Sequence, residues 1–364
     1  MRRFAVFVVA GLLVLAACGP GPAPAATEVS PPATPSEPRT VRLMTHDSFD
    51  ASEEVIAAFE AQYNAKVVVL QAGDAGVVLN QAILSRDNPL ADVLYGVDNT
   101  LLSRALKADI LDPYPSPLLE QIPDELELDP QQRALPVDYG DVCLNYDEGW
   151  FAGHGLTPPA DLEDLAKPAY KGLVVVENPA TSSPGLAFLL ATIGHFGVTG
   201  DYTYLDYWAD LRQNDLLAVE GWEDAYYGQF TYGSQGEGTR PIVVSYASSP
   251  PAEVYFAEQP LEEAPTAAVV GDGSCFRQVE FVGILKGAQN RDLAQAWVDY
   301  MLGKTFQEDI PLHMFMFPAN QNAALPEVFS RFALIPEHPA QVDYAAIETN
   351  REAWVEAWTE VVLR

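Results

Sequence analysis

The sequence predicts an α/β protein whose body is made of two lobes. First, 364 residues are enough for roughly two domains of about 150 residues each. Second, short apolar runs alternate with amphipathic helical patterns from Val41 onward, which is typical of β-α-β units around a parallel sheet. Third, another set of such elements begins near Asp138, and the two sets account for the rest of the chain.

The first 17 residues have the layout of a secretory signal peptide. Arg2 and Arg3 precede an apolar run, Phe4–Ala17, that is shorter than the roughly 20 residues of a membrane span. The run ends in Leu15-Ala16-Ala17-Cys18-Gly19, which resembles a bacterial lipobox. We therefore predict a lipoprotein-type signal with Cys18 lipidated after cleavage. An ordinary signal peptide with an incidental cysteine is the alternative.

Residues 18–40 are predicted to be the lipidated cysteine and a proline-rich tether. Gly19–Thr40 holds seven prolines and no apolar periodicity. In polyproline geometry, at about 3.1 Å per residue, this segment reaches about 70 Å. The protein is therefore expected outside the cytoplasm, periplasmic or on the outer cell surface, and in contact with the membrane through its lipid anchor only.

The chain carries 51 acidic and 20 basic side chains, a formal net charge of −31. No nucleic acid is expected as a partner, because neutralising phosphates requires a surplus of Lys and Arg. Adhesion to anionic lipid is disfavoured for the same reason. The acidity is explained either by attraction of a cationic ligand or by solubility.

The first set of elements predicts three strands, each followed by a helix. The strands are Val41–His46, Lys66–Gln71 and Ala91–Gly96, and the helices are one capped by Ser52, Val77–Arg86 and Thr100–Ala108. Ligands of such sheets bind beyond the carboxyl ends of the strands. The candidate loops are therefore His46–Asp50, Gln71–Ala75 and Gly96–Thr100.

The second set supplies further strands and most of the helices. The predicted strands are Gly140–Tyr146, Leu173–Glu177, Pro241–Tyr246 and Phe276–Lys286. The predicted helices are Pro184–Phe196, Tyr202–Gln213, one from Glu223, Arg291–Leu302, Thr305–Asp309 and Ala345–Val362. Ser183 suits the N-cap of the helix that begins with Pro184, where free N–H groups favour a phosphate or another electron-rich group. Plain capping is the alternative.

Two cysteines, Cys143 and Cys275, remain once Cys18 is assigned to the lipid. Outside the cytoplasm two such cysteines most often pair, and two buried free thiols are the alternative. The sequence has no CxxC and no Cys/His cluster at zinc spacing, so neither a metal nor a cofactor is expected.

The sequence shows no signature of an enzyme. The G-x-S-x-G, H-E-x-x-H and Walker patterns are missing, and the five histidines are scattered. We therefore predict a protein that is not an enzyme, with a secreted hydrolase as the least favoured alternative. The strand-end loops instead offer the Asp47 carboxylate and the rings of Trp222 and Tyr246, a combination that suits a flat organic cation. For Trp222, ordinary core packing is the alternative.

Seven short segments carry a family resemblance through their shared order and spacing. They are Thr45–Phe49, Ala91–Asn99, Pro136–Gly140, Thr181–Gly185, Gly221–Tyr226, Ser245–Pro250 and Gln278–Glu280. Over residues 41–364 the chain resembles the periplasmic thiamine-binding proteins of bacterial ABC importers, within the extracellular solute-binding proteins that close around a ligand.

The resemblance implies a two-lobed periplasmic-binding-protein fold of type II, in which each lobe is a sheet flanked by helices and crossing hinge strands join the lobes. Residues 41–138 would begin lobe 1, residues 139–276 would form lobe 2, and residues 277–364 would return to lobe 1 and add the C-terminal helices. The resemblance also implies a monomeric substrate-binding lipoprotein. It would capture thiamine or its phosphate esters and deliver them to the permease and ATPase of an ABC importer.

The resemblance further implies a set of ligand-binding residues. Asp47 and Ser48 would reach the cleft from lobe 1, the Thr181–Ser183 hydroxyls and N–H groups would face the hydroxyethyl or phosphate end, and Trp222 and Tyr246 would face the rings. The full set is His46, Asp47, Ser48, Asp98, Thr181, Ser182, Ser183, Trp222, Tyr226, Tyr246, Ser249 and Phe315.

The chain departs from the family pattern at three aromatic positions. His46 and Ala252 stand where a Tyr is usual, and Phe315 stands where a Trp is expected. The alternative is a binding protein of the same fold for another cation, ferric iron or a polyamine, since the adjacent tyrosines Tyr226 and Tyr227 are similar to the ligands of iron binders. Because the crossing strands of this family run side by side, the resemblance also implies a disulfide between Cys143 and Cys275.

Overall fold

The computed structural model describes residues 37–364 of the chain. The predicted signal peptide, the lipidation of Cys18 and nearly all of the tether lie outside the described residues. Residues 38–364 form one structural unit. No helix within the described residues has both the length and the apolar character to cross a membrane.

The strands of the described residues are β1 (Arg39–Thr45), β2 (Ala65–Gln71), β3 (Val93–Asp98), β4 (Leu111–Asp112), β5 (Leu135–Asp147), β6 (Val174–Glu177), β7 (Leu217–Val219), β8 (Ile242–Tyr246), β9 (Thr266–Val269), β10 (Phe276–Leu285) and β11 (Phe317–Pro318). They belong to one continuous sheet, whose main path has the order β2-β1-β3-β10-β5-β8-β6-β7.

The helices are α1 (Glu53–Tyr63), α2 (Ala75–Leu84), α3 (Leu102–Lys107), α4 (Glu148–His154), α5 (Leu162–Leu165), α6 (Ser183–Phe196), α7 (Tyr204–Gln213), α8 (Pro250–Tyr255), α9 (Arg291–Leu302), α10 (Lys304–Gln307), α11 (Ile310–His313), α12 (Glu327–Phe332) and α13 (Tyr344–Val362). Three short 3₁₀ helices, η1 (Pro117–Gln121), η2 (Asp124–Leu126) and η3 (Pro168–Tyr170), and a π-helical segment, η4 (Asp224–Gln229), complete the list.

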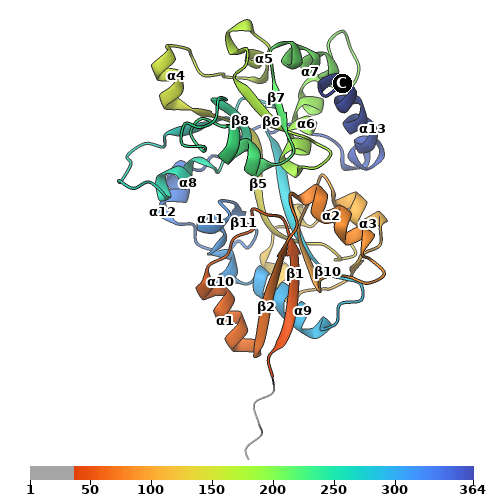
Figure 1. Ribbon diagram of the computed structural model, residues 1–364. Helices are drawn as coiled ribbons and strands as arrows, with labels where there is room; N and C mark the ends of the chain where they lie inside the picture. The colour runs from red at the N-terminus through yellow and green to blue at the C-terminus, as the bar shows by residue number, and fades with distance from the viewer. Residues whose placement is uncertain (1–36) are drawn as a thin grey trace, which may run out of the picture. The chain divides into compact units, whose positions relative to one another are not determined.

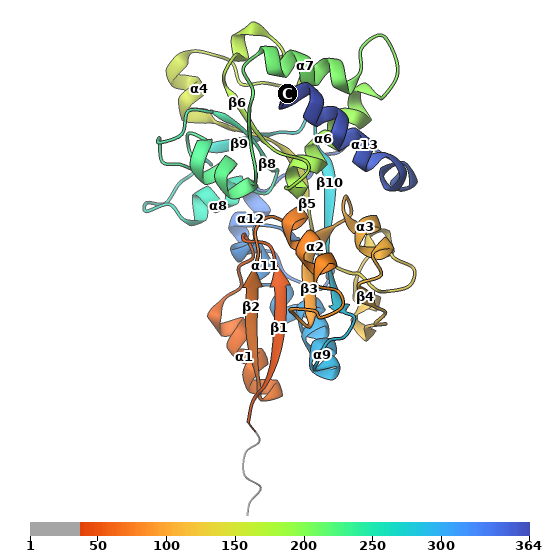
Figure 2. The same ribbon diagram turned by 45° about the vertical axis from the view of Figure 1, so that its right-hand side comes forward.

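The elements of residues 38–364 gather into two lobes, which confirms the predicted α/β two-lobed fold (Figures 1 and 2). Lobe 1 is built around the parallel strands β2, β1 and β3. Lobe 2 is built around the parallel strands β8, β6 and β7. The sheet is mixed, because β10 runs antiparallel to both β3 and β5, and β5 runs antiparallel to β8.

Strands β5 and β10 connect the two lobes. They pair antiparallel from Phe276↔Val142 to Val282↔Leu135. At one end β10 pairs with β3 of lobe 1, and at the other end β5 pairs with β8 and β9 of lobe 2. These two strands are therefore the crossing strands that the resemblance implied. The exact lobe boundaries remain predictions.

A disulfide joins Cys143 to Cys275, which lie 132 residues apart in sequence and have a Cα–Cα distance of 4.4 Å. Cys143 is a residue of β5, and Cys275 directly precedes β10. Both side chains are fully buried. The implied pairing is therefore present, and it ties the two crossing strands together on the side of lobe 2.

Capping explains where several helices begin. The Ser52 hydroxyl accepts a hydrogen bond from the N–H of Val55, as predicted for the start of α1. The predicted cap of α6 was wrong by one residue: Ser182 is the N-cap, and its hydroxyl accepts from the N–H of Gly185. Ser183 thereby becomes the first residue of the helix.

The last two helices pack on lobe 2. Helix α12 contacts α8, and α13 contacts α7. The α13 contact centres on Trp358, whose ring lies edge-on to that of Trp208 with 5.5 Å between centroids. Both tryptophans are almost completely buried. The chain thus ends on the lobe opposite to the one in which its described part begins (Figure 1).

Candidate ligand-binding cleft

A cleft of about 380 Å³ lies between the two lobes. Its volume falls in the range of small-molecule sites. Lobe 1 contributes the loops after β1 and β2, which sequence analysis selected, together with the segment around α11. Lobe 2 contributes the start of α6, the segment that leads into η4, and the end of β8 with α8. The lining residues are His46, Asp47, Ser48, Phe49, Asp50, Asp74, Ala75, Ser183, Pro184, Trp222, Glu223, Tyr226, Tyr227, Tyr246, Ser249, Ala252, Phe256, Glu280, His313, Met314, Phe315 and Met316.

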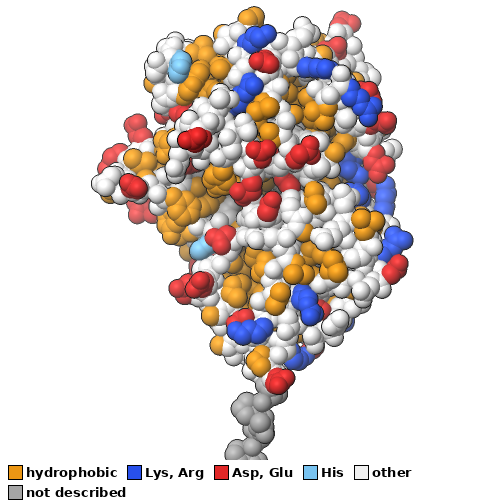
Figure 3. Space-filling view, viewed as in Figure 1, with side chains coloured by type: hydrophobic (Ala, Val, Ile, Leu, Met, Phe, Trp, Pro, Cys, Tyr) orange, Lys and Arg blue, Asp and Glu red, His pale blue; other side chains and the backbone are white. Residues whose placement is uncertain are grey.

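The cleft is strongly acidic. Its lining includes the carboxyl groups of Asp47, Asp50, Asp74, Glu223 and Glu280, whereas none of the described residues that line it is Lys or Arg. The surface around it agrees, since acidic side chains gather near the middle of the face shown in Figure 3. An acidic, partly enclosed site favours a cationic ligand.

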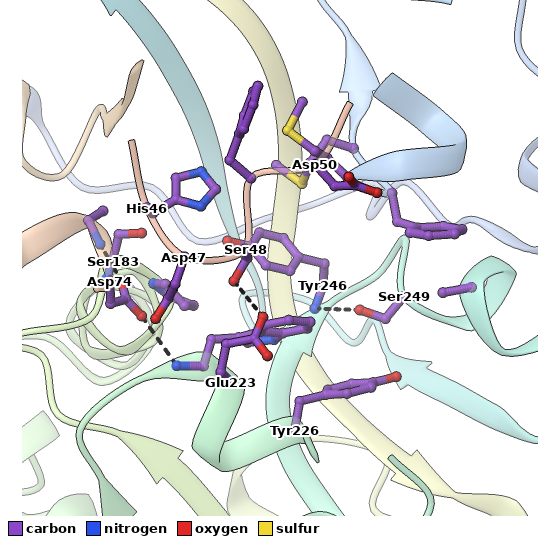
Figure 4. Close-up of a pocket in the computed structure, with 18 of the residues that line it drawn as sticks. His46, Asp47, Ser48, Asp50, Asp74, Ser183, Glu223, Tyr226, Tyr246 and Ser249 are labelled. Atoms are coloured by element: carbon purple, nitrogen blue, oxygen red, sulfur yellow. Dashed lines mark hydrogen bonds between the residues drawn. The ribbon is translucent and has the colours of Figure 1, made fainter. Parts of the chain in front are cut away.

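Asp74 links the two lobes across the cleft (Figure 4). One carboxylate oxygen accepts from the N–H of Ala75 at 2.7 Å and from that of Ser183 at 3.1 Å, and the other accepts from the N–H of Trp222 at 3.2 Å. Burial raises the pKa of Asp74, although hydrogen bonds from Ser183, Ser182 and Trp222 act to lower it. A backbone hydrogen bond beside Asp74, from the N–H of Gly76 to the carbonyl of Thr181 at 3.1 Å, also joins the two lobes.

A second interlobe bond lies beside Asp74. The Ser48 hydroxyl donates to the Glu223 carboxylate at 3.0 Å (Figure 4). Burial raises the pKa of Glu223, and the bond from Ser48 opposes that rise. The loops after β1 and β2 therefore both form hydrogen bonds with lobe 2. The two lobes are in contact at this part of the cleft.

The lobe 2 wall of the cleft is aromatic. The ring of Trp222 stacks on that of Tyr226 with centroids 4.9 Å apart, and its indole N–H donates to the Ser245 hydroxyl at 3.0 Å. The Tyr226 hydroxyl donates to Glu253 at 2.5 Å, which fixes the second ring. Tyr246 is held by its own hydroxyl, which donates to the side-chain oxygen of Gln278 at 2.7 Å. These rings form a firmly held wall.

Three further rings meet between the two lobes, and two of them, Phe256 and Phe315, line the cleft. Phe315 comes from lobe 1, and its centroid lies 5.6 Å from that of Phe256 and 6.2 Å from that of Tyr255 on lobe 2. Phe315 has a φ of 54°, a backbone conformation that residues with a Cβ rarely adopt. Phe256 follows Ala252 by one helical turn, with its N–H bonded to the Ala252 carbonyl, so it supplies a ring beside the position where the family pattern has lost one.

The floor of the cleft is a buried polar cluster. His46 lies 3.7 Å from Glu280, and the Tyr95 hydroxyl lies between Glu280, at 3.0 Å, and Asp138. Burial alone would lower the pKa of His46, but Glu280 raises it above its ordinary value. Burial and the neighbouring Glu280 hold the pKa of Asp138 well above its usual range, whereas His46 lowers that of Glu280.

Most of the predicted ligand-binding residues line this cleft, and three do not. Those that line it are His46, Asp47, Ser48, Ser183, Trp222, Tyr226, Tyr246, Ser249 and Phe315. The Thr181 hydroxyl donates to the Glu220 carbonyl, Ser182 caps α6, and Asp98 is buried behind the cleft, where Gln278, Thr100 and Leu101 donate to it. The roles of all these residues toward a ligand remain predictions.

Sequence reasoning did not single out several cleft residues, among them Asp74, Glu223, Phe256, Glu280 and His313. Glu223 and Glu280 stood within segments that carried the resemblance, and Asp74 stood in a predicted strand-end loop. Phe256 could have been found only from its spacing of four residues after Ala252. Within the described part of the chain, no group of three or more His, Cys, Asp or Glu residues is arranged to hold a metal ion.

Two lobes that share a pair of crossing strands and enclose an acidic, aromatic cleft define the architecture of a solute-binding protein. The chain belongs to the bacterial extracellular solute-binding proteins, because the model of that family matches residues 88–333, more than half of the chain. The members of this family are described as solute-binding proteins. At the level of the family, this agrees with the expectation that the protein is not an enzyme.

The chain is also similar to individual proteins of known name. The chain is 28% identical to the thiamine-binding periplasmic protein of Escherichia coli K12, over 88% of this chain and 93% of that protein. A solved structure titled periplasmic thiamin binding protein matches with a TM-score of 0.78 and 26% identity, covering 92% of this chain and 99% of the other. Iron uptake protein A1 of Synechocystis is 24% identical over 92% of this chain and 90% of that protein.

Proposed function

We propose that the protein is the substrate-binding component of an ABC importer, which captures thiamine or one of its phosphate esters in the interlobe cleft and delivers it to the permease and ATPase. The acidic and aromatic cleft carries the proposal, and the names of the relatives support it. The ligand-binding residues would be those predicted ones that line the cleft.

Thiamine combines a permanent positive charge on the thiazolium ring with a flat aminopyrimidine. The wall formed by Trp222, Tyr226 and Tyr246 offers ring surfaces for stacking and cation–π contact. The carboxylates of Asp47 and Glu280 offer the opposite charge and hydrogen-bond acceptors. A site of this composition suits a flat organic cation, because its rings can stack on the ligand and its carboxylates can neutralise the positive charge.

The proposal includes the cellular context. The protein would be a monomer outside the cytoplasm, periplasmic or at the cell surface, held to the membrane by a lipid on Cys18 after removal of the signal peptide. No cofactor is part of this proposal, and the protein itself would not be an enzyme. The mass of the mature protein tests the lipid, since cleavage before Cys18 and acylation change it together.

Ferric iron is the second candidate, favoured by the name of the Synechocystis relative and by the adjacent tyrosines. The geometry of the tyrosines argues for thiamine instead, because the Tyr226 hydroxyl is already bonded to Glu253 and its ring stacks on Trp222. A polyamine would suit the acidic charge but would make little use of the stacked rings.

Native mass spectrometry of the purified protein, followed by calorimetric titration with thiamine, ferric citrate and spermidine, tests the proposal. Thiamine at 100 times its dissociation constant is expected to stabilise the fold by about 2.7 kcal/mol. Trp222→Ala should weaken thiamine binding by about 1–3 kcal/mol through lost ring contact, and Trp222→Phe should weaken it less. If the protein bound iron or spermidine but did not bind thiamine, the assignment of thiamine as the ligand would be overturned.

A further inference from the structure

We propose, resting on the proposed function, that His46 and Glu280 exchange a proton for the positive charge of the ligand. Glu280 is the counter-ion of the bound cation, and His46 releases a proton to the solvent as the cation arrives, so that one N–H bond of its imidazolium ring breaks. Both residues lie at the floor of the cleft, where the loop after β1 meets β10 (Figure 4). The family pattern has a Tyr at position 46, so this exchange would be a property of this chain.

His46 faces Glu280 without a hydrogen bond between them. The Nε2 atom of His46 lies 3.7 Å from the Glu280 carboxylate, and the two side chains are only 13% and 7% exposed. This nitrogen is buried and has no hydrogen-bond partner among the described residues. Buried polar atoms are normally hydrogen-bonded. The charge of Glu280, and not a hydrogen bond, therefore holds the proton on the ring.

Packing fixes the imidazole ring at this place. Gly96 of β3 has a φ of 90°, and a side chain at this position would collide with the His46 ring. Glycine adopts this backbone conformation readily and leaves room for the ring. The ring of Tyr95 covers His46 from the same strand, with 5.7 Å between centroids. Because packing positions His46, the loss of its proton does not require the ring to move.

The ionisable groups around His46 favour a proton on its ring. They are Glu280 of β10, Asp74 after β2, Asp47 in the same loop, Glu223 from lobe 2 and the phenol of Tyr95. Burial acts to lower the pKa of His46, but these acids, and Glu280 above all, raise it above the ordinary value of 6.5. More than half of the molecules therefore carry this proton at pH 6.5.

A cation bound against the aromatic wall comes close to the same carboxylate. The Tyr246 hydroxyl donates to Gln278, which lies two residues before Glu280 and on the same face of β10. Two positive charges beside one buried carboxylate repel each other strongly. The charge of the thiazolium ring is permanent, whereas the imidazolium can lose its charge. The proton of His46 therefore leaves.

Calorimetric titration of the full chain with thiamine, in three buffers that differ in their enthalpy of ionisation, counts the protons released. At about pH 6.5 we expect release of roughly half a proton or more per thiamine, and affinity about tenfold higher at pH 7.5 than at pH 5.5. His46→Gln should bind thiamine with almost no proton release. The matched control is His338→Gln, the same substitution at an exposed histidine outside the cleft lining, which should behave as the unmodified protein does.

Thiamine binding without proton release, or with proton uptake, would overturn the inference and leave the proposed function standing. Release that persists in a folded His46→Gln variant would assign the proton to a buried acid such as Asp98 or Asp138 and would also overturn it. If His46→Gln does not fold, His46→Tyr is titrated in its place, and the proton count of the unmodified protein still tests the exchange. Failure of thiamine to bind at any of these pH values would overturn the proposed function and this inference together.

Discussion

Asp138 of β5 and Glu280 of β10 are cross-strand neighbours, and the hydroxyl of Tyr95 is placed between their two carboxyl groups. The pair lies at the point where both lobes share these strands. Glu280 also lines the cleft and faces His46, so the same cluster that fastens the crossing strands forms the floor of the candidate binding cleft. Substitutions in this cluster are therefore expected to affect the stability of the protein.

Removing the Tyr95 hydroxyl should destabilise the protein. Tyr95→Phe leaves two buried carboxyl groups without the donor they share, and such losses cost about 1–3 kcal/mol. Urea denaturation measures the change. Tyr207→Phe is the matched control, because Tyr207 is equally buried and its hydroxyl has no hydrogen-bond partner among the described residues. Equal effects of the two substitutions would contradict the role assigned to the cluster.

The stability of the protein should fall as pH rises from about 4 to 7 in a way that depends on Asp98. Burial raises the pKa of Asp98 from 3.8 to about 7, despite bonds from Thr100 and Gln278. The folded state therefore keeps a proton that the unfolded chain has lost. Its stabilising effect is complete below the unfolded pKa and disappears as pH rises through the folded value.

Asp98→Asn isolates this contribution. The unmodified protein should lose roughly 1–4 kcal/mol more than the variant between pH 4 and 7.5, given about 1.4 kcal/mol for each pKa unit. Chemical denaturation at a series of pH values measures the difference between the two curves. Parallel curves would show that Asp98 is not protonated in the folded protein.

Reduction of the Cys143–Cys275 disulfide should lower stability without lowering affinity. The bond closes a loop of 132 residues, and the chain-entropy model assigns such a loop at most about 5 kcal/mol. Neither sulfur belongs to the cleft lining. The double variant Cys143→Ala, Cys275→Ala should therefore melt at a lower temperature and bind thiamine with unchanged affinity at 20–25 °C. If a folded variant lost affinity for thiamine, the disulfide would instead be needed for the movement that closes the two lobes.

Local sequence patterns were sufficient for most of the fold. Helix α9 has the predicted bounds, Arg291–Leu302, because its apolar spacing is regular and Gly303 follows it. Strand β1 begins two residues earlier than predicted, at Arg39. Its first two residues pair with β2 but are not buried in the core, so they carry no apolar signal. Short elements such as β9 and α8 were missed, because four to six residues carry too little periodicity.

The site was predictable only in part, for a physical reason. Strand-end loops could be selected from the chain order, so His46 to Ser48 were found. Asp74 lay in another of the selected loops, but its bonds across the cleft could not be predicted, because its partners Ser183 and Trp222 follow it by 109 and 148 residues and come from the other lobe. Contacts made by closing two lobes leave no local pattern in the sequence.

Phe256 should contribute to ligand affinity through its ring in the cleft lining, if the proposed function holds. It lines the cleft, contacts Phe315 of the opposite lobe and is 69% exposed. Phe256→Ala removes a ring that a bound ligand would cover, so we expect thiamine to dissociate faster and bind about tenfold more weakly, or about 1.4 kcal/mol. The fold should persist, since an exposed ring contributes little to the core.

Tyr255→Ala is the control for this ring. Tyr255 precedes Phe256 at the end of α8, also contacts Phe315 and is 48% exposed, but it does not line the cleft. Stopped-flow tryptophan fluorescence gives the dissociation rate for each variant. If the rings act only by holding the lobes together, both substitutions should accelerate dissociation equally. An effect confined to Phe256→Ala would instead place its ring against the ligand, in compensation for the ring that Ala252 lacks.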